Sequence, residues 1–227
     1  MAATLSIIIP VYNGATFLAE AVASLTGQDP PPGEIVVVDD GSTDAIQEVV
    51  KGLGTTVRYI RQANGGPAAA RNHGLRLAVG DIIGFLDVDD LWQPGSLAGQ
   101  LALLEGDAAA GIVKGLTQVQ ERLPGNTYGP VGKPFVFWNL GGTLYRREVF
   151  TVVGPFDEGL RYAEDLDWFL RARDAGIDLR LLDQVTQLHR RHGGNMTEGR
   201  TPGELNILRV VKASLDRRRA GGPPSTK

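Results

Sequence analysis

Residues 82–90, IIGFLDVDD, constrain the fold of this chain more than any other stretch. The run begins with apolar side chains and ends in three carboxylates within four positions, Asp87, Asp89 and Asp90. An apolar run of this length, preceded by Gly80 and followed by acids, predicts a strand that is covered on both faces, as in a parallel sheet. Such sheets bind ligands at the carboxyl ends of their strands, so the run predicts an acidic ligand site at that edge.

A strand followed by a helix occurs three times before this run. The strands are predicted at residues 5–11, 34–39 and 57–61, and the helices at residues 16–25, 45–53 and 67–79. This alternation predicts right-handed crossovers and a parallel sheet, hence an α/β fold. Polar loops should therefore converge at one edge of the sheet, namely residues 12–13, 39–44, 64–66 and 87–90.

A helix at residues 96–104 and a strand at residues 109–114 are predicted to complete the first half of the chain. The pattern is less regular after residue 114, where helices are predicted at residues 147–153, 164–175 and 202–217 and strands at residues 135–145, 179–182 and 185–189. Residues 115–133 have no clear period, which predicts an irregular connection or a hairpin. In the last helix the apolar residues predicted to form the packing stripe are Leu205, Leu208, Val211 and Leu215.

Composition excludes several classes of function. The 227 residues carry 23 basic and 26 acidic side chains, a balance that disfavours nucleic acid as the main partner. Without cysteine the chain forms no disulfide and no thiolate metal site, so a metal ion would need oxygen or imidazole ligands. Because no apolar run approaches the ~20 residues that cross a bilayer, we expect a cytoplasmic protein, with peripheral membrane contact left open.

The acidic cluster itself predicts a metal site. Mg²⁺ and Mn²⁺ are bound by one or two carboxylates together with phosphate oxygens of a bound nucleotide. If the strand stays extended, Asp87 and Asp89 point to the same side while Val88 points away. An EF-hand is excluded because Leu91 and Trp92 stand where its loop needs an oxygen ligand and then the invariant glycine. The alternative is a solvated acidic turn.

The other strand ends carry weaker signals. Asp39 follows the second strand, where it would either cap the next helix or accept a hydrogen bond from a nucleotide base. Asn64 and Gly65 precede a helix and would present N–H groups to a phosphate, with Arg71 adding charge. The alternative for Arg71 is an ordinary surface cation.

Seven segments taken together resemble the inverting family 2 glycosyltransferases of the A-type fold. They are residues 6–13 (SIIIPVYN), 37–44 (VVDDGSTD), 64–66 (NGG), 70–74 (ARNHG), 85–90 (FLDVDD), 154–158 (GPFDE) and 164–167 (EDLD). The resemblance implies a single domain in which a Rossmann-like nucleotide-binding parallel sheet, residues 1–114, continues into a mixed sheet. Residues 115–200 would then bind the acceptor and carry the base, and residues 201–227 would form a C-terminal helix and a disordered tail.

The resemblance also implies the reaction and its residues. The reaction is a metal-dependent, inverting transfer of a sugar from a nucleotide-diphosphate sugar, with a UDP-type donor favoured, to a hydroxyl of a saccharide, lipid-linked or small-molecule acceptor. The implied donor-site residues are Pro10, Val11, Tyr12, Asn13, Asp39, Asn64, Gly65, Arg71, Asp87 and Val88. Asp89, Asp87 and His192 are the implied ligands of Mn²⁺ or Mg²⁺. Asp165, beside Glu164, is the implied catalytic base.

Each of these assignments has a plainer alternative. Glu164 and Asp165 also suit a helix N-terminus, and His192 also suits a surface loop. Tryptophans more often fill cores than bind sugars. A basic end of the last helix suits the helix dipole, although a membrane surface or a homodimer is also open. For the whole chain the rivals are a nucleotidyltransferase, disfavoured because residues 12–16 carry no cation, and a non-catalytic nucleotide-binding module.

Overall fold

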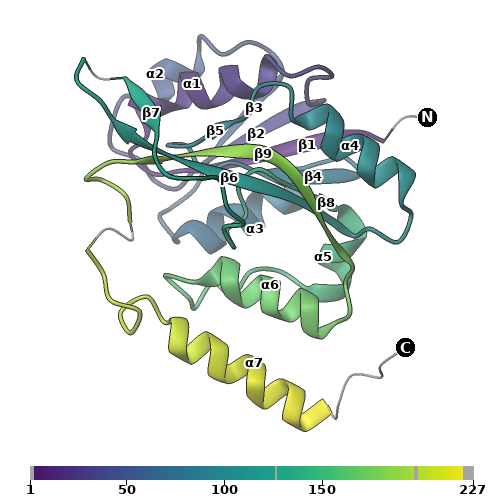
Figure 1. Cartoon of the computed structure of the whole chain (residues 1–227). Helices are drawn as coiled ribbons and strands as arrows, with labels where there is room; N and C mark the ends of the chain where they lie inside the picture. Colours follow the sequence, from purple (N-terminus) through teal and green to yellow (C-terminus); the bar gives the residue numbers. More distant parts are fainter. Residues whose placement is uncertain (1–2, 126, 197–198, 222–227) are drawn as a thin grey trace.

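The computed structural model describes residues 3–125, 127–196 and 199–221 (Figure 1). Its strands are β1 (Leu5–Val11), β2 (Glu34–Asp39), β3 (Val57–Arg61), β4 (Ile82–Phe85), β5 (Leu91–Trp92), β6 (Ile112–Arg122), β7 (Tyr128–Pro130), β8 (Thr143–Arg146) and β9 (Leu179–Arg191). Its helices are α1 (Ala15–Thr26), α2 (Ile46–Val50), α3 (Pro67–Leu77), α4 (Leu97–Gly106), α5 (Arg147–Val153), α6 (Glu164–Asp174) and α7 (Ile207–Gly221).

One mixed sheet runs through the whole domain in the order β3-β2-β1-β4-β8-β6-β9-β5, with β7 paired to β6. The first four strands are parallel, as the alternation of strands and helices predicts. β8 joins them antiparallel to β4 and continues the sheet into the second part of the chain. The predicted α/β fold, in which a parallel sheet continues into a mixed one, is therefore confirmed.

Both faces of the sheet are covered by helices, which explains the continuous apolar runs of its strands. On β1, Ile7 and Ile9 point into a core formed with α1 and α4, whereas Ile8 points into a second core with α3, α5 and α6. In Figure 1, α1 lies above the sheet, and α3, α5 and α6 lie below it. Because alternate residues of a strand face opposite sides, a fully apolar strand is what such a three-layer arrangement requires.

The second part of the chain differs from the predicted elements. β6 does not end at residue 114 but runs to Arg122, and it pairs with β9, which is one strand rather than two. The register shifts near Gly115, where a Cβ atom would lie 2.2 Å from Thr186 Cγ2. The glycine therefore permits a close approach of two strands instead of ending one. The predicted hairpin is confirmed as the β6–β7 pair, whereas of residues 135–145 only the last three belong to a strand, β8.

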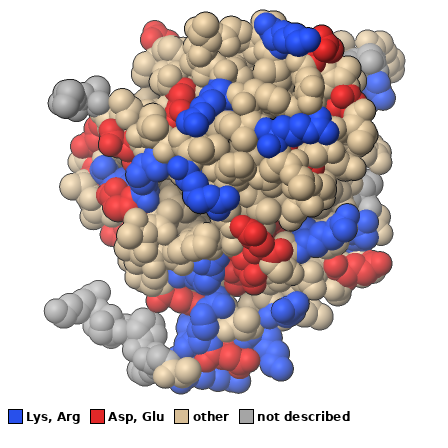
Figure 2. Space-filling view, turned by 180° about the vertical axis from the view of Figure 1, so that it is seen from behind, with Lys and Arg blue, Asp and Glu red and all other residues tan. Residues whose placement is uncertain are grey.

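The last helix packs with a different face from the predicted one. Val210 and Ser214 are buried, whereas Leu208 is 70% exposed and Val211 and Leu215 are also exposed. This face joins apolar and polar contacts, because Val210 is buried while Ser214 accepts a hydrogen bond from Arg173 and donates one to Asp174 of α6. Basic side chains gather at the lower end of the molecule, where α7 lies (Figure 2). The predicted disordered tail, residues 222–227, lies outside the described residues.

No helix among the described residues is both long and apolar enough to span a membrane.

Candidate active site

The loops after β1 and β2 are tied to each other at the carboxyl edge of the sheet. Asn13 has a positive φ of 54°, and its backbone N–H donates to Ser42 Oγ at 2.9 Å. Its side-chain oxygen accepts the N–H of Thr43 at 2.7 Å. Tyr12 is left exposed next to this pair of loops, and Pro10 and Val11 are buried in β1 behind it. The predicted base-binding residues are thus brought to one edge.

Asp39 is fully buried and organises the loop after β2. Burial alone would raise its pKa, but hydrogen bonds from Ser42 and Tyr59 hold the pKa below its ordinary value, so the carboxylate is charged. The Ser42 N–H lies 2.7 Å from Asp39 Oδ1, a contact that fixes the turn after β2. Asp39 does not cap the next helix, because the N-cap of α2 is Ala45 and has no side-chain cap hydrogen bond. The same carboxylate accepts the Tyr59 hydroxyl.

The loop of residues 64–66 does not present free N–H groups to a phosphate. The N–H groups of Gly65 and Gly66 both donate to the Asp40 carboxylate at 2.8 Å, and Asn64 Nδ2 donates to the Asp40 carbonyl. Asp40 is buried and needs these donors to offset its lost hydration. Asn64 and Gly65 therefore shape the loop in this structure, and the prediction of free phosphate-binding donors is wrong.

Arg71 is not a surface cation, because its side chain is only 7% exposed and joins two distant carboxylates. Nη2 lies 2.7 Å from Asp87 Oδ1, and Nη1 is paired with Glu164 at the start of α6. Burial alone would lower the pKa of Arg71, but these two carboxylates raise it above its ordinary value. The guanidinium therefore connects α3, the loop after β4 and α6 through one permanently charged group.

The acidic residues after β4 form a turn rather than an extension of the strand. β4 ends at Phe85, and the N–H of Asp90 donates to the carbonyl of Asp87 at 3.0 Å. The two predicted metal ligands consequently diverge, Asp87 toward Arg71 and Asp89 toward the segment after β9. The expectation that Asp87 and Asp89 face the same side of an extended strand is wrong for this reason.

Asp90 anchors the turn to β9. Its buried carboxylate accepts hydrogen bonds from Gln187 Nε2 at 2.6 Å and from the Arg190 N–H at 3.0 Å, and it lies 3.1 Å from His189 Nδ1. The side chain of Arg190 in turn donates to the Asp89 carbonyl. Sequence reasoning missed these β9 residues. Their only local signal is that Gln187 and His189 alternate along a strand and so share a face.

Asp89 and His192, two of the predicted metal ligands, lie side by side in the acidic site. His192 Nε2 and Asn195 Nδ2 lie 3.2 Å and 3.0 Å from Asp89 Oδ2, and the His192 ring stacks on Phe17. Burial and the nearby Asp90 and Asp87 carboxylates raise the pKa of Asp89 to about 7, a crowding of negative charge that a cation would relieve.

Burial and the neighbouring Arg190 lower the pKa of His192, which favours the neutral imidazole. Among residues 3–125, 127–196 and 199–221, no three His, Asp or Glu side chains are arranged to hold a metal ion, so Asp87 does not join this pair. One carboxylate and one imidazole still suffice where substrate phosphates complete the coordination.

Asp165 lies in the first turn of α6, next to the Glu164 that pairs with Arg71. Its Oδ1 accepts the N–H of Leu166 at 2.7 Å. Burial, and after it the Glu164 carboxylate, raise the pKa of Asp165 to about 7, against the opposing effect of Arg71. A carboxylate with a pKa near neutrality is suited to accept a proton from a substrate hydroxyl, which an ordinary helix-capping acid is not.

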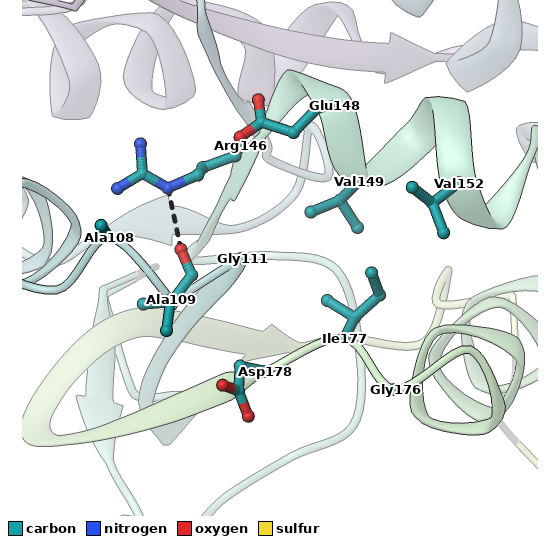
Figure 3. Close-up of a pocket in the computed structure, with 11 residues that line it drawn as sticks. Ala108, Ala109, Gly111, Arg146, Glu148, Val149, Val152, Gly176, Ile177 and Asp178 are labelled. Carbon is teal, nitrogen blue, oxygen red and sulfur yellow. Dashed lines mark hydrogen bonds between the residues drawn. The ribbon is translucent and has the colours of Figure 1, made fainter.

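A cavity of about 220 Å³ lies away from these groups (Figure 3). It is lined by residues of α5, of the connections that precede β6 and β9, and by Arg146, whose Nε donates to the Ala110 carbonyl at 2.9 Å. Aliphatic side chains such as Val149, Val152 and Ile177 form much of its wall. None of the predicted site residues lines this cavity, so it is separate from the candidate active site.

Several solved structures share the fold of this chain. The chain aligns with S. aureus TarS, residues 1–349, in complex with UDP-GlcNAc, with a TM-score of 0.74 and 22% identity, over 93% of this chain and 66% of that one. GalNAc-T7 with UDP, GalNAc and Mn²⁺ aligns with a TM-score of 0.75 and 20% identity, over 95% of this chain and 49% of that one. At these identities the likeness establishes a shared fold.

Sequence comparison establishes the family. An uncharacterized glycosyltransferase EpsJ of Bacillus subtilis is 31% identical over 85% of this chain and 62% of its own length. The succinoglycan biosynthesis protein ExoU of Rhizobium meliloti is 32% identical over 78% of this chain and 58% of its own length. The chain thus spans about three fifths of these relatives. The model of the family described as glycosyl transferase family 2 matches residues 6–154, and the chain belongs to that family.

Proposed function

We propose that the protein transfers a sugar from a nucleotide-diphosphate sugar, of the UDP type, to an acceptor hydroxyl, with inversion at the anomeric carbon and with a divalent metal ion. The observation that carries this proposal is the pair of contacts made by Arg71, which brings the acidic turn after β4 next to the N-terminus of α6. Donor and base residues that are about 75 positions apart thereby share one site. The UDP, UDP-GlcNAc and Mn²⁺ named with the matched structures support the donor and the metal ion.

Each group has a role that its position supports. The nucleotide base would lie by Pro10, Val11, Tyr12, Asn13 and Asp39, and the ribose and diphosphate by Asp87, Val88 and Arg71. Asp89 and His192 would hold Mn²⁺ or Mg²⁺, which when bound neutralises negative charge on the leaving diphosphate. Asp87 is assigned to the donor rather than to the metal ion because Arg71 already pairs with its carboxylate.

The transfer is a single displacement. The acceptor oxygen forms a bond to the anomeric carbon while the bond from that carbon to the diphosphate oxygen breaks, and the electron pair of the broken bond leaves with the diphosphate. The hydroxyl proton passes to the carboxylate of Asp165. Glu164 keeps Arg71 in place and does not need to touch the substrate. Attack from the side opposite the leaving group inverts the configuration.

Donor binding tests the proposal. Isothermal titration of UDP and UDP-GlcNAc is expected to show binding in the presence of Mn²⁺, and Asp89→Ala is expected to weaken that binding at least about tenfold because a metal ligand is lost. Asp183→Ala, which removes an exposed carboxylate of β9, is the matched control and should bind as the unaltered chain does. Absence of nucleotide binding with Mn²⁺ present would overturn the proposed function.

The rate of transfer should depend on pH through Asp165. The base accepts a proton only when ionised, so kcat/KM for the acceptor is expected to rise with pH up to about pH 7 and to level off above it. Below that pH the rate should fall about tenfold per unit. The measurement needs saturating donor and Mn²⁺. UDP affinity is measured at each pH, so that an effect of Asp89 titration on donor binding is distinguished from the effect of Asp165 on transfer. A flat profile across this range would remove Asp165 from the proton transfer.

Peripheral membrane contact and a homodimer stay predictions. The exposed face of α7, with Leu208, Val211 and Leu215, is the surface that either would use.

A further inference from the structure

The connection between β7 and β8 carries exposed aromatic side chains that neither core explains. Phe135, Phe137 and Trp138 are 45%, 38% and 47% exposed, whereas Trp92 and Trp168 are fully buried. The Phe135 and Phe137 rings also lie against each other, with centroids 5.8 Å apart. Aromatic rings grouped on a surface leave apolar area in water, and such groups mark binding sites more often than single exposed residues do.

The two ends of this aromatic group reach both sides of the candidate active site. The Phe137 ring lies 5.6 Å from the ring of His189, whose Nδ1 is 3.1 Å from the Asp90 carboxylate below the acidic turn. The Trp138 ring lies 5.6 Å from Phe169 in an edge-to-face contact. Phe169 follows Asp165 by four residues on α6, so the two side chains are neighbours on one face of the helix. The rings therefore extend from the donor side to the base.

A buried lysine fixes the backbone just after Trp138. Lys114 of β6 is 1% exposed, and its Nζ donates to the Asn139 carbonyl at 2.9 Å and to Thr143 Oγ1 at 3.0 Å. It also lies over the Phe169 ring, 5.9 Å from the centroid. Burial lowers the pKa of Lys114 to about 7, against the opposing effect of the Asp165 carboxylate. The two hydrogen bonds from Lys114 hold the backbone that follows Trp138 in one position.

We propose that Phe137 and Trp138 form a platform that stacks on the ring of a saccharide acceptor and that Lys114 is its positioning residue. A pyranose ring presents C–H groups on one face, which pack on an aromatic ring, and hydroxyls at its rim, which need polar partners. His189 supplies a polar group beside the Phe137 ring, and Asn139, whose side-chain oxygen accepts a bond from Lys114, follows Trp138 in the chain. An alkyl chain has no polar atoms that could bond to these two residues. The inference rests on the proposed function and assigns the class of acceptor.

Fluorescence can report on the platform directly, because Trp138 is the exposed one of the three tryptophans. The probes are methyl and octyl glycosides of glucose, galactose and N-acetylglucosamine, added with UDP and Mn²⁺ present. Stacking is expected to change the tryptophan emission, and Trp138→Phe should abolish that change. An effect of methyl glycosides shows recognition of the sugar itself, whereas an effect confined to octyl glycosides would overturn the proposal in favour of an apolar ligand.

Kinetics provide the second readout. With a glycoside that is accepted, Trp138→Ala and Phe137→Ala are each expected to raise the acceptor KM and so to lower the ratio of transfer to donor hydrolysis about tenfold. Trp138→Phe should keep most of this ratio, because it keeps an aromatic ring at the position. Lys114→Met should raise the same KM and shift Trp138 emission to longer wavelength. The control is Leu123→Ala, an equally exposed apolar residue after β6 that should change neither quantity.

The outcomes separate the platform from the proposed function. If UDP-sugar is hydrolysed with Mn²⁺ but no glycoside is accepted or alters the emission, the saccharide platform is wrong while the donor chemistry stands. An unchanged acceptor KM in Trp138→Ala and Phe137→Ala would lead to the same conclusion. An unchanged KM in Lys114→Met would remove only the positioning role. If no UDP-sugar is bound or hydrolysed, the proposed function itself has failed.

Discussion

Asp165→Asn is expected to lower the rate of sugar transfer by about 10²- to 10⁴-fold, the usual contribution of a general base. The amide keeps the size of the side chain and its acceptor oxygen for the Leu166 N–H, but it no longer takes up a proton at this pH. UDP binding with Mn²⁺ should be unchanged, because the acidic turn and Arg71 are intact. Transfer and binding are measured on the same preparation, and a rate equal to that of the unaltered chain would contradict the role of Asp165.

The same variant has a stability signature that separates a lost base from a damaged fold. The pKa of Asp165 is about 7 in the folded chain and 3.8 when the chain is unfolded. Between these two pH values the folded chain therefore binds a proton at Asp165 that the unfolded chain does not. The stability that this proton contributes is present below the lower value and is lost as pH rises through the higher one. Asp165→Asn should therefore raise Tm relative to the unaltered chain at pH 8 more than at pH 5. Asp183→Asn, on the exposed edge of β9, should show no such difference.

Arg71→Met is expected to lower the free energy of unfolding by about 3–5 kcal/mol, the cost of removing one partner from a buried ion pair. Glu164 is nearly as buried as Arg71 and would lose its counter-charge. The Asp87 and Glu164 carboxylates would then be separated by an apolar side chain instead of a cation. Urea unfolding measures the effect. Arg71→Lys should recover only part of it, because a single ammonium group does not reach both carboxylates as the guanidinium fork does.

Arg58→Met is the control for Arg71. Arg58 is an exposed arginine of β3 whose contact is one hydrogen bond to the Leu77 carbonyl, so its loss should cost less than about 1 kcal/mol. A double-mutant cycle with Glu164→Gln isolates the pair, and the two substitutions together should cost much less than the sum of their separate effects. If Arg71→Met is no worse than Arg58→Met, the central place given to this guanidinium is wrong.

Local pattern in the sequence was enough to predict the parallel part of the fold. β2 and β3 coincide with the predicted ranges, and α3 begins at Pro67 as predicted, because apolar runs between glycine, proline and acidic residues are short-range signals. β6 was truncated in the prediction because Gly115 resembles a strand terminator unless the Thr186 side chain and the Gln184 carbonyl that lie against it are known. β4 was extended too far because nothing local distinguishes an acidic strand end from an acidic turn.

The candidate site was predictable as a set of residues but not as a set of contacts. The motifs identified Asp87, Asp89 and Asp165 but not their contacts. Asp87 pairs with Arg71, 16 residues before it, whereas Asp89 contacts His192 and Asn195, 103 and 106 residues after it. Side-chain pairs separated by about 100 residues leave no periodic trace in a single sequence. The rotation of α7 was missed for a related reason, since the contacts of Ser214 with Arg173 and Asp174 come from another helix.

The anchoring of Asp90 by β9 limits how this domain could be divided or recombined. A fragment that ends after the parallel strands would retain the motif of the acidic turn but lose Gln187, His189 and Arg190, which hold that turn in place. A chimaera that exchanged the second part of the chain to obtain another acceptor would have to retain these β9 residues, or it would lose the donor site as well. The acidic turn and its anchor on β9 are thus one unit that recombination has to keep together.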